Sequence, residues 1–397
     1  MTGARVVLLL VLIAGLLLLA FCWVTVRTRS WSALARRLAA LGALGVAALW
    51  GYSHRPLPHR DDCALPSRPG ELGSICGVRN PEDLELVPEL GLVVTAEFER
   101  GGRLMALRLA DLSAAPVPLW PTSTEEPPPS TPALGDAACT ARPDPRTFFP
   151  HGLSVSAATA ERGPLLAVVT HGRPDTLHLF ELRGDAQPRA EWRGCIPYPA
   201  ETTGNDVALL RDGSLVATNF SPEIFGFHGW RYTMRAILGI TTGDVLRWSP
   251  GAGWSHIPET RGAGPNGVVV TADESRFYFA DGGHETVRVG SLGEAPSGNS
   301  GISIGAPPDN LSIGTTGAIL ATVATFRGEF PLLCSLGGRE CRLGWAVLEI
   351  DPESHQISEL VAEPGRQIAT ATSALEVGPY LFIGTMEDDR VGVYRRR

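Results

Sequence analysis

The chain has 397 residues, of which 44% are hydrophobic, and it carries a formal net charge of −8 with no lysine. This acidic balance argues against nucleic-acid binding, which needs a basic surface. The length allows two or three ordinary domains or one large all-β domain with a sizeable core.

Two apolar runs near the N-terminus predict a membrane anchor. Val6–Val26 is uncharged over 21 residues and is long enough to cross a bilayer as a helix, whereas Leu38–Tyr52 is short for a span. The loop between them carries four arginines and should lie on the cytoplasmic side. Residues 1–55 are therefore predicted to be a membrane anchor of one helix or a helical hairpin. Two crossings would place the rest of the chain outside, and one crossing would place it inside.

The cysteines favour the outside. Six of the seven cysteines lie in turn-rich segments, and an even number in loops is typical of disulfides formed in an oxidising compartment. Cys334 and Cys341 are the closest pair in sequence. We therefore predict an anchored extracytoplasmic domain, on the periplasmic or extracellular side.

Repeated strand pairs dominate the chain after a linker at residues 56–75. Six units, each an apolar strand, a turn and a second strand, are spread over residues 76–397 at roughly 50 residues each, which is the size of a propeller blade. The predicted fold is an all-β six-bladed β-propeller; a solenoid and a two-domain sandwich are the alternatives. The proline-rich segment Pro116–Gly135 is predicted to be an exposed excursion between blades.

One segment departs from the strand pattern. Phe225–Ile240 is aromatic and apolar with a weak helical spacing. In a propeller, an insertion of this kind lies across one face. It could cover the central tunnel or pack against the edge of a blade.

Polar residues stand where the inner strand of each unit begins. In a propeller these positions converge on the central axis, and here they hold carboxylates and amides, the oxygen ligands that a hard cation such as calcium prefers. Asx residues are also ordinary turn residues, but four pairs in successive units exceed what turns alone would predict. The pairs are Glu82-Asp83, Asn205-Asp206, Asn266-Gly267 and Asp309-Asn310.

Together with the histidine motif FFPHGLSV, these pairs resemble the calcium-dependent paraoxonase/arylesterase-type lactonases. The similarity extends over about residues 76 to 395. The PNG-type unit alone is shared with gluconolactonase-like propellers; the PHG motif with separate ND and DN pairs is more specific. The matching segments, in order, are PEDLELV from Pro81, FFPHGLSV from Phe148, VVTHGRPDTLHLFEL from Val168, GNDVALL from Gly204, PNGVVVTADESRFYFAD from Pro265 and PDNLSIG from Pro308.

The resemblance implies a six-bladed propeller with two calcium ions on its axis, and it implies a role for each matching residue. The ligands of the catalytic calcium would be Glu82, Asn205, Asn266, Asp309 and Asn310. Those of the structural calcium would be Asp83, Asp206 and the backbone carbonyl of Leu153. His151 would activate the attacking water with His171 in support, and the catalytic calcium would stabilise the oxyanion.

Three positions depart from the family pattern. The family cysteine that joins the first and last strands matches Cys76, but its expected partner position near Tyr394 holds no cysteine, so Cys63 or another loop cysteine would replace it. Thr322–Gly328 lacks the family histidine, and Phe220 and Ser221 replace polar residues. The ligand set is thus better supported than any particular substrate.

The function predicted from the sequence is calcium-dependent hydrolysis of lactones or aryl esters, with hydrophobic small molecules as substrates and the membrane as a partner. One alternative is a gluconolactonase-like sugar-lactone hydrolase with one metal. Another is a non-catalytic calcium-stabilised propeller that binds a partner. No nucleophile elbow of the strand, Gly-x-Ser-x-Gly, helix type is predicted, which argues against a serine hydrolase. Asn219 and Asn310 each begin a glycosylation acceptor pattern.

Overall fold

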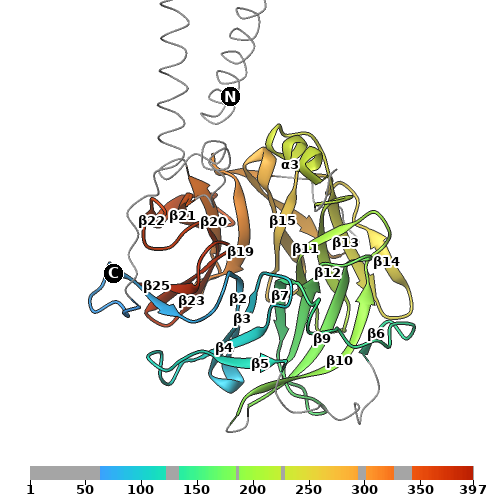
Figure 1. Cartoon of the computed structure of the whole chain (residues 1–397). Helices are drawn as coiled ribbons and strands as arrows, with labels where there is room; N and C mark the ends of the chain where they lie inside the picture. Colours follow the sequence, from blue (N-terminus) through green and yellow to red (C-terminus); the bar gives the residue numbers. More distant parts are fainter. Residues whose placement is uncertain are drawn as a thin grey trace, which may run out of the picture.

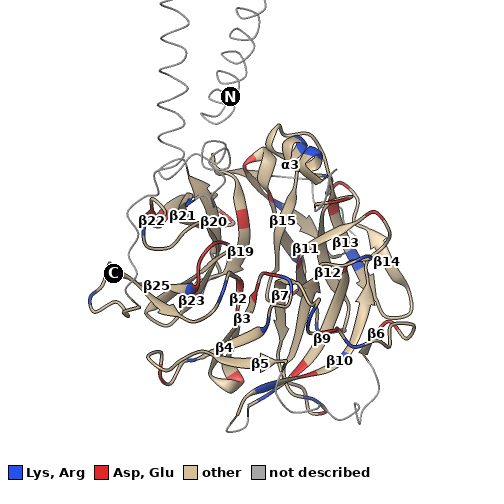
Figure 2. Ribbon diagram, in the orientation of Figure 1, with Lys and Arg blue, Asp and Glu red and all other residues tan. Residues whose placement is uncertain are grey.

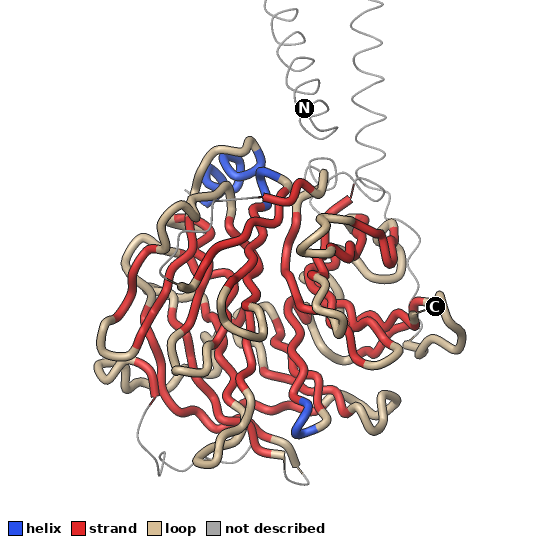
Figure 3. The backbone as a smooth tube through the Cα atoms, turned by 180° about the vertical axis from the view of Figure 1, so that it is seen from behind, coloured by secondary structure: helices blue, strands red, loops and turns tan. Residues whose placement is uncertain are grey.

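The computed structural model describes residues 63–121, 134–184, 187–224, 229–293, 301–325 and 342–396. These residues form six sheets arranged around a central axis (Figure 1), which confirms the prediction of a six-bladed β-propeller. Viewed from behind, the described backbone consists of strands joined by turns and loops, with helix confined to short segments (Figure 3).

Each blade is a sheet of four strands with the first strand innermost, and blade II gains a fifth. In order from the axis outward, blade I consists of β2 (Pro81–Val87), β3 (Leu92–Glu97), β4 (Leu104–Arg108) and β5 (Val117–Trp120). Blade II consists of β7 (Pro150–Ser156), β8 (Leu165–Thr170), β9 (Thr176–Arg183), β10 (Arg189–Pro197) and β6 (Leu134–Gly135). Blade III consists of β11 (Thr203–Leu209), β12 (Leu215–Ser221), β13 (Asp244–Ser249) and β14 (Gly253–His256).

The last three blades follow the same plan. Blade IV consists of β15 (Pro265–Val270), β16 (Arg276–Asp281), β17 (Thr286–Ser291) and β18 (Gly301–Ser303). Blade V consists of β19 (Pro308–Ile313), β20 (Ile319–Thr325), β21 (Gly344–Ile350) and β22 (Ile357–Glu363). Blade VI consists of β23 (Ala371–Val377), β24 (Tyr380–Thr385), β25 (Arg390–Arg395) and β1 (Leu72–Cys76).

The core is divided into layers between neighbouring blades. Six apolar clusters of buried side chains lie one at each blade interface, so every sheet is apolar on both faces. At the interface of blades I and II, for example, Leu119, Leu166 and Phe180 are completely buried. Burial of one such side chain stabilises the fold by roughly 1.5–3 kcal/mol. The strands therefore show apolar runs rather than strict alternation in sequence.

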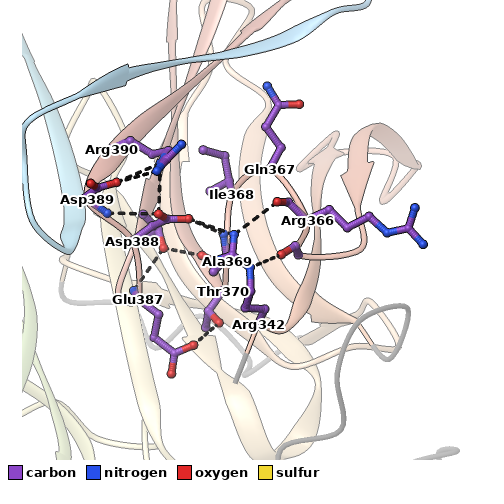
Figure 4. A network of polar contacts seen from close by, with 12 residues as sticks. Arg342, Arg366, Gln367, Ile368, Ala369, Thr370, Glu387, Asp388, Asp389 and Arg390 are labelled. Atoms are coloured by element: carbon purple, nitrogen blue, oxygen red, sulfur yellow. Dashed lines mark hydrogen bonds and ion pairs between the residues drawn. The ribbon is translucent and has the colours of Figure 1, made fainter. Parts of the chain in front are cut away.

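The ring closes where β1 pairs with β25, so the last blade combines both ends of the described chain. Beside this seam, Asp388 accepts hydrogen bonds from Ala369 N at 3.1 Å and from the Arg342 and Arg390 side chains at 3.2 and 3.1 Å (Figure 4). Its backbone carbonyl accepts a bond from Asn80 N at 2.6 Å. This buried carboxylate therefore ties together the turns on both sides of the seam.

Two disulfides lie in the described residues. Cys63 is bonded to Cys76, which confirms one of the replacements expected for the missing family pairing, and Cys139 is bonded to Cys195. The register places Cys76 opposite Arg390, so no cysteine on β25 faces it. Cys334 and Cys341 lie outside the described residues.

The proline-rich segment was predicted wrongly in part. Within Pro116–Gly135, Val117–Trp120 is the outermost strand of blade I, and Leu134–Gly135 pairs with β10 of blade II. Leu119 and Trp120 are buried in the core between these blades. Two prolines, Pro116 and Pro118, are compatible with an edge strand, where an N–H donor is not needed on both sides.

The segment expected to be helical contains α3 (Gly229–Ile237), which follows β12 and precedes β13 in the chain. It lies at the top of Figure 1. It contacts the short 3-10 helix η2 (Gly282–His284) of blade IV, while η1 (Pro88–Leu90) follows β2. The two apolar runs expected to anchor the chain lie outside the described residues. Among the residues described, no helix is both long and apolar enough to cross a bilayer.

Candidate active site at the tunnel mouth

The inner strands all begin with the same irregularity. After the first residue of each inner strand, or after the second residue in β11, two residues are skipped in the pairing with the neighbouring strand, so each inner strand carries a β-bulge near its start. We call these residues the bulge pairs: Glu82-Asp83, His151-Gly152, Asn205-Asp206, Asn266-Gly267, Asp309-Asn310 and Thr372-Ser373. The sequence-predicted site residues, apart from Leu153 and His171, belong to this set.

In two bulge pairs the second residue must be glycine, because the backbone of the neighbouring blade leaves no room for a Cβ atom. A Cβ atom on Gly152 would lie 2.4 Å from the carbonyl oxygen of Asn205, and one on Gly267 would lie 2.5 Å from the Cα atom of Asn310. Each glycine therefore allows the next bulge pair to approach closely. These contacts hold the ring of bulge pairs together around the axis.

The predicted ligands of the catalytic calcium converge from four blades. Asn310 of blade V donates a hydrogen bond of 2.8 Å to Glu82 Oε1 of blade I, and the Asn266 side chain bonds Asp309. Glu82, Asn205 and Asn310 are at most 4% exposed, while Asn266 and Asp309 are half-buried. The acidic positions of β2 and β19 are visible near the axis in Figure 2.

Four buried oxygens in this group receive no hydrogen bond from any of the described residues. They are Glu82 Oε2, Asn205 Oδ1, Asn266 Oδ1 and Asn310 Oδ1. Buried polar atoms normally have partners, so orphaned oxygens on the bulge pairs of four blades fit a hard cation. Within the described ranges, no three His, Cys, Asp or Glu side chains form a metal-binding group by themselves. The residues that fit a cation here are two carboxylates combined with three amides.

The carboxyl groups at the tunnel mouth repel one another. Burial raises the pKa of Glu82 to about 7, and burial together with the neighbouring Glu82 raises the pKa of Asp83 to about 8. Burial and the charges nearby also raise the pKa values of Asp206 and Asp309 well above their usual range. A bound divalent cation would remove this repulsion and allow the group to ionise at neutral pH.

Asp83 and Asp206, the predicted ligands of the structural calcium, connect neighbouring blades. Asp83 Oδ2 accepts a bond of 2.8 Å from Leu153 N in blade II, and Asp206 Oδ2 accepts one of 2.7 Å from Val268 N in blade IV. The other oxygen of each accepts the N–H of the following residue. Each oxygen has a second lone pair, so these bonds are compatible with a shared cation.

His151 and His171 are in direct contact, as the resemblance implied. His171 Nε2 lies 2.9 Å from His151 Nδ1, and His151 Nε2 lies 3.5 Å from Glu82 Oε1. Burial lowers the pKa of His151 to about 4 and also lowers the pKa of His171. Both imidazoles are therefore neutral at pH 7, and a neutral imidazole can accept a proton.

Three features of the site were missed in the sequence. Phe98 packs on His151 with ring centroids 4.4 Å apart, and Phe149 meets His171 at 5.3 Å, so aromatic rings shield the histidines from water. Thr372 and Ser373, the sixth bulge pair, donate hydrogen bonds of 2.5 and 2.9 Å to the carbonyl of Glu82. Thr372-Ser373 could have been found in the sequence, because it occupies the strand start one blade after Asp309-Asn310.

The third missed feature is Asp175, on the loop between β8 and β9. It lies 3.0 Å from His171 Nδ1 and also lines a cavity of about 810 Å³ between this loop, Tyr198 and α3. The glycosylation patterns, in contrast, are not available for modification in the folded chain, since Asn219 is 7% and Asn310 is 2% exposed.

The fold and the ring of bulge pairs define a class: a six-bladed propeller with a polar site at one end of its central tunnel. A gluconolactonase of Xanthomonas campestris is similar over 86% of this chain and 98% of its own, with 18% identity and a TM-score of 0.51. A luciferin-regenerating enzyme is similar over 81% of this chain and 94% of its own, with 11% identity and a TM-score of 0.52. At these identities the likeness establishes the fold.

Regucalcin of Agrobacterium tumefaciens, a calcium-binding protein, is also similar, at 15% identity over 81% of this chain and 92% of its own and with a TM-score of 0.47. No protein-family model matches the sequence, and no curated protein matches it either. The resemblance to the paraoxonase/arylesterase-type lactonases remains a prediction.

Proposed function

We propose that this protein is a calcium-dependent hydrolase that cleaves lactones, and aryl esters of similar size, with water. The observation that carries the proposal is the contact of His151 with Glu82, at 3.5 Å, inside a group of four orphaned side-chain oxygens. A proton acceptor and a cation-binding group thus lie beside each other. Hydrolysis of an activated carbonyl needs both.

The catalytic ion would be held by Glu82, Asn205, Asn266, Asp309 and Asn310. When bound, calcium polarises a carbonyl oxygen and stabilises negative charge on it. His151 Nε2 takes a proton from water as the water oxygen forms a bond to the carbonyl carbon, and the ester C–O bond then breaks. The alkoxide leaving group accepts a proton, so a lactone and one water give one hydroxy acid. Phe98 and Phe149 exclude other water from the histidines.

Two further observations support an apolar substrate and an oxidising compartment. The half-buried rings of Phe98 and Phe149 favour apolar substrates, such as lactones with an acyl chain. The disulfides Cys63–Cys76 and Cys139–Cys195 favour an oxidising compartment, so we place the propeller on the extracytoplasmic side of a membrane, anchored by residues 1–55.

The direct test is hydrolysis of a panel of aliphatic lactones and aryl esters by the full chain, with calcium and with a chelator. Activity should require calcium and should fall by about 10²–10⁴-fold in His151→Gln, in which the general base is lost. Asp351→Asn, which changes an exposed carboxylate in the turn between the two outer strands of blade V, is the control. Activity that survives complete removal of calcium would reject the proposal.

A second candidate is a sugar-lactone hydrolase with a single metal, as the gluconolactonase neighbour suggests. Both oxygens of Asp83 and of Asp206 already accept backbone N–H bonds, which favours this candidate. One bound metal per chain and a preference for polar sugar lactones would support it over the two-calcium form.

A further inference from the structure

A carboxylate, that of Asp175, contacts the histidine pair on the side away from Glu82. Asp175 Oδ2 lies 3.0 Å from His171 Nδ1, His171 Nε2 lies 2.9 Å from His151 Nδ1, and His151 Nε2 faces the tunnel mouth near Glu82. The contacts therefore run in a line from Asp175 through both imidazoles to the cation-binding group. No sequence pattern marked Asp175 for this place.

The loop holds Asp175 in one orientation. Its Oδ1 accepts a hydrogen bond of 2.8 Å from Gly172 N, and its Oδ2 accepts one of 3.1 Å from Gly204 N of blade III. Both oxygens are thus fixed by N–H donors from two blades, and the residue is only 7% exposed. Neither oxygen can turn away from His171 without breaking one of these bonds.

This arrangement determines which ring nitrogens carry protons. A carboxylate oxygen accepts, so the proton of neutral His171 lies on Nδ1, and its Nε2 must then accept. His151 therefore donates from Nδ1 to His171, and its own lone pair is on Nε2. That nitrogen is the one directed at the tunnel mouth, where a water would be activated.

We propose that Asp175 is a positioning residue that fixes the tautomers of both histidines, so that His151 presents an unprotonated Nε2 to the substrate site. The inference rests on the proposed function for its catalytic consequence, but the tautomer assignment itself depends only on the geometry. Asp175 does not contact the substrate site; it acts through His171.

Asparagine at this position reverses the pattern. An amide has one acceptor oxygen, whereas Asp175 receives N–H donors on both oxygens. If the amide oxygen keeps the shorter bond, of 2.8 Å from Gly172 N, and gives up the 3.1 Å bond from Gly204 N, its NH₂ group faces His171 Nδ1 and donates to it. His171 would then carry its proton on Nε2 and would no longer accept from His151.

The test uses the full chain with ¹⁵N-labelled histidine. In the wild type, His171 should show the Nδ1–H tautomer in its ¹⁵N shifts, and Asp175→Asn should shift it to Nε2–H. With an aliphatic δ-lactone as substrate, kcat should fall about 10–100-fold while KM changes little. Calcium content should stay at the wild-type level, since no proposed ligand is changed.

Asp281→Asn is the matched control. Asp281 is also fully buried, and it also accepts a backbone N–H and lies 2.9 Å from a histidine Nδ1, that of His284, but it belongs to blade IV and does not touch the pair. It should leave kcat and the His171 tautomer unchanged, so a general loss of packing is separated from positioning.

The outcomes distinguish the two proposals. A wild-type His171 protonated on Nε2 would overturn the inference without any variant, and so would an Asp175→Asn protein that keeps both the wild-type tautomer and kcat. A wild type that hydrolyses no lactone rejects the proposed function, while the tautomer measurement still decides the role of Asp175.

Discussion

Asn310 donates its side-chain N–H to Glu82 Oε1 at 2.8 Å, although the two residues are 228 positions apart and lie in blades V and I. The amide oxygen of the same asparagine has no hydrogen-bond partner within the part of the chain that the structure describes. One side chain thus orients a carboxylate across the axis and offers an oxygen to the cation-binding group. Replacing Asn310 therefore tests whether the contact between blades V and I contributes to cation binding.

Asn310→Leu should lower calcium affinity by at least about tenfold, because one ligand oxygen and the orientation of Glu82 are lost together. Isothermal titration with calcium measures the change. Asn219→Leu is the control: Asn219 is also a buried, hydrogen-bonded asparagine, but it bonds Asp244 in blade III. Equal affinities in the two variants would show that Asn310 is not a ligand.

Asp206→Asn should destabilise the protein more in calcium than in chelator. In chelator, the loss of one acceptor for Val207 N or Val268 N costs about 1–3 kcal/mol of unfolding free energy, and relief of the repulsion between Asp206 and Asp83 offsets part of this cost. In calcium, the loss of a ligand adds to this cost. Urea unfolding under both conditions measures the difference, and an identical loss in both would assign Asp206 to blade connection alone.

Gly152→Ala should destabilise the fold by about 1–3 kcal/mol or prevent it from forming, because the new Cβ would lie 2.4 Å from the Asn205 carbonyl oxygen. Gly301→Ala is the control, since its Cβ would find no atom closer than 3.5 Å. Thermal unfolding compares the two. A Gly152→Ala protein as stable as the control would mean that the bulge pairs are less closely packed than described.

His178 should make the protein sensitive to acid. Burial lowers its pKa from 6.5 to about 4, and its Nδ1 accepts the indole N–H of Trp192 at 3.2 Å. As pH falls below 6.5, the unfolded chain takes up a proton that the folded chain refuses, so stability is lost between pH 6.5 and 4, by roughly 3 kcal/mol. Above pH 6.5 the contribution is constant.

His178→Gln keeps an acceptor for Trp192 and should flatten this part of the stability curve, measured by urea unfolding from pH 7 to 4. His256→Gln, which replaces a side chain that is 68% exposed, should keep the wild-type slope. An unchanged slope in His178→Gln would assign the acid sensitivity to other groups.

Asp388→Asn should loosen the seam of the ring. The change removes a buried negative charge bonded to Arg342 and Arg390 and should cost about 1–3 kcal/mol. Amide exchange should speed up in β1 and β25. In Asp389→Asn, an adjacent carboxylate whose side chain is 64% exposed, exchange should stay slow. Protection of β1 that is equal in both variants would contradict this role.

The sequence by itself determined the repeating plan. Apolar runs separated by turns at blade-sized intervals predict the propeller, because each sheet must be apolar on both faces to pack between two neighbours. The polar residues at four strand starts predicted a cation site near the axis, whereas the individual ligands and the two histidines were implied by the resemblance to a lactonase family and remain predictions. The apolar runs and the polar strand starts are properties of single repeats, and a linear pattern records them.

Only the tertiary structure decided how the repeats meet. Thr372-Ser373 resembles any pair of small polar residues until the ring closes and places both hydroxyls on the carbonyl of Glu82. Val117–Trp120 becomes a strand because blades I and II bury Leu119 and Trp120 between them. Asp175 contacts His171 within one loop of blade II, but it reaches Gly204 only because blades II and III lie side by side. Contacts between blades depend on closure of the whole ring, and a local pattern carries no record of them.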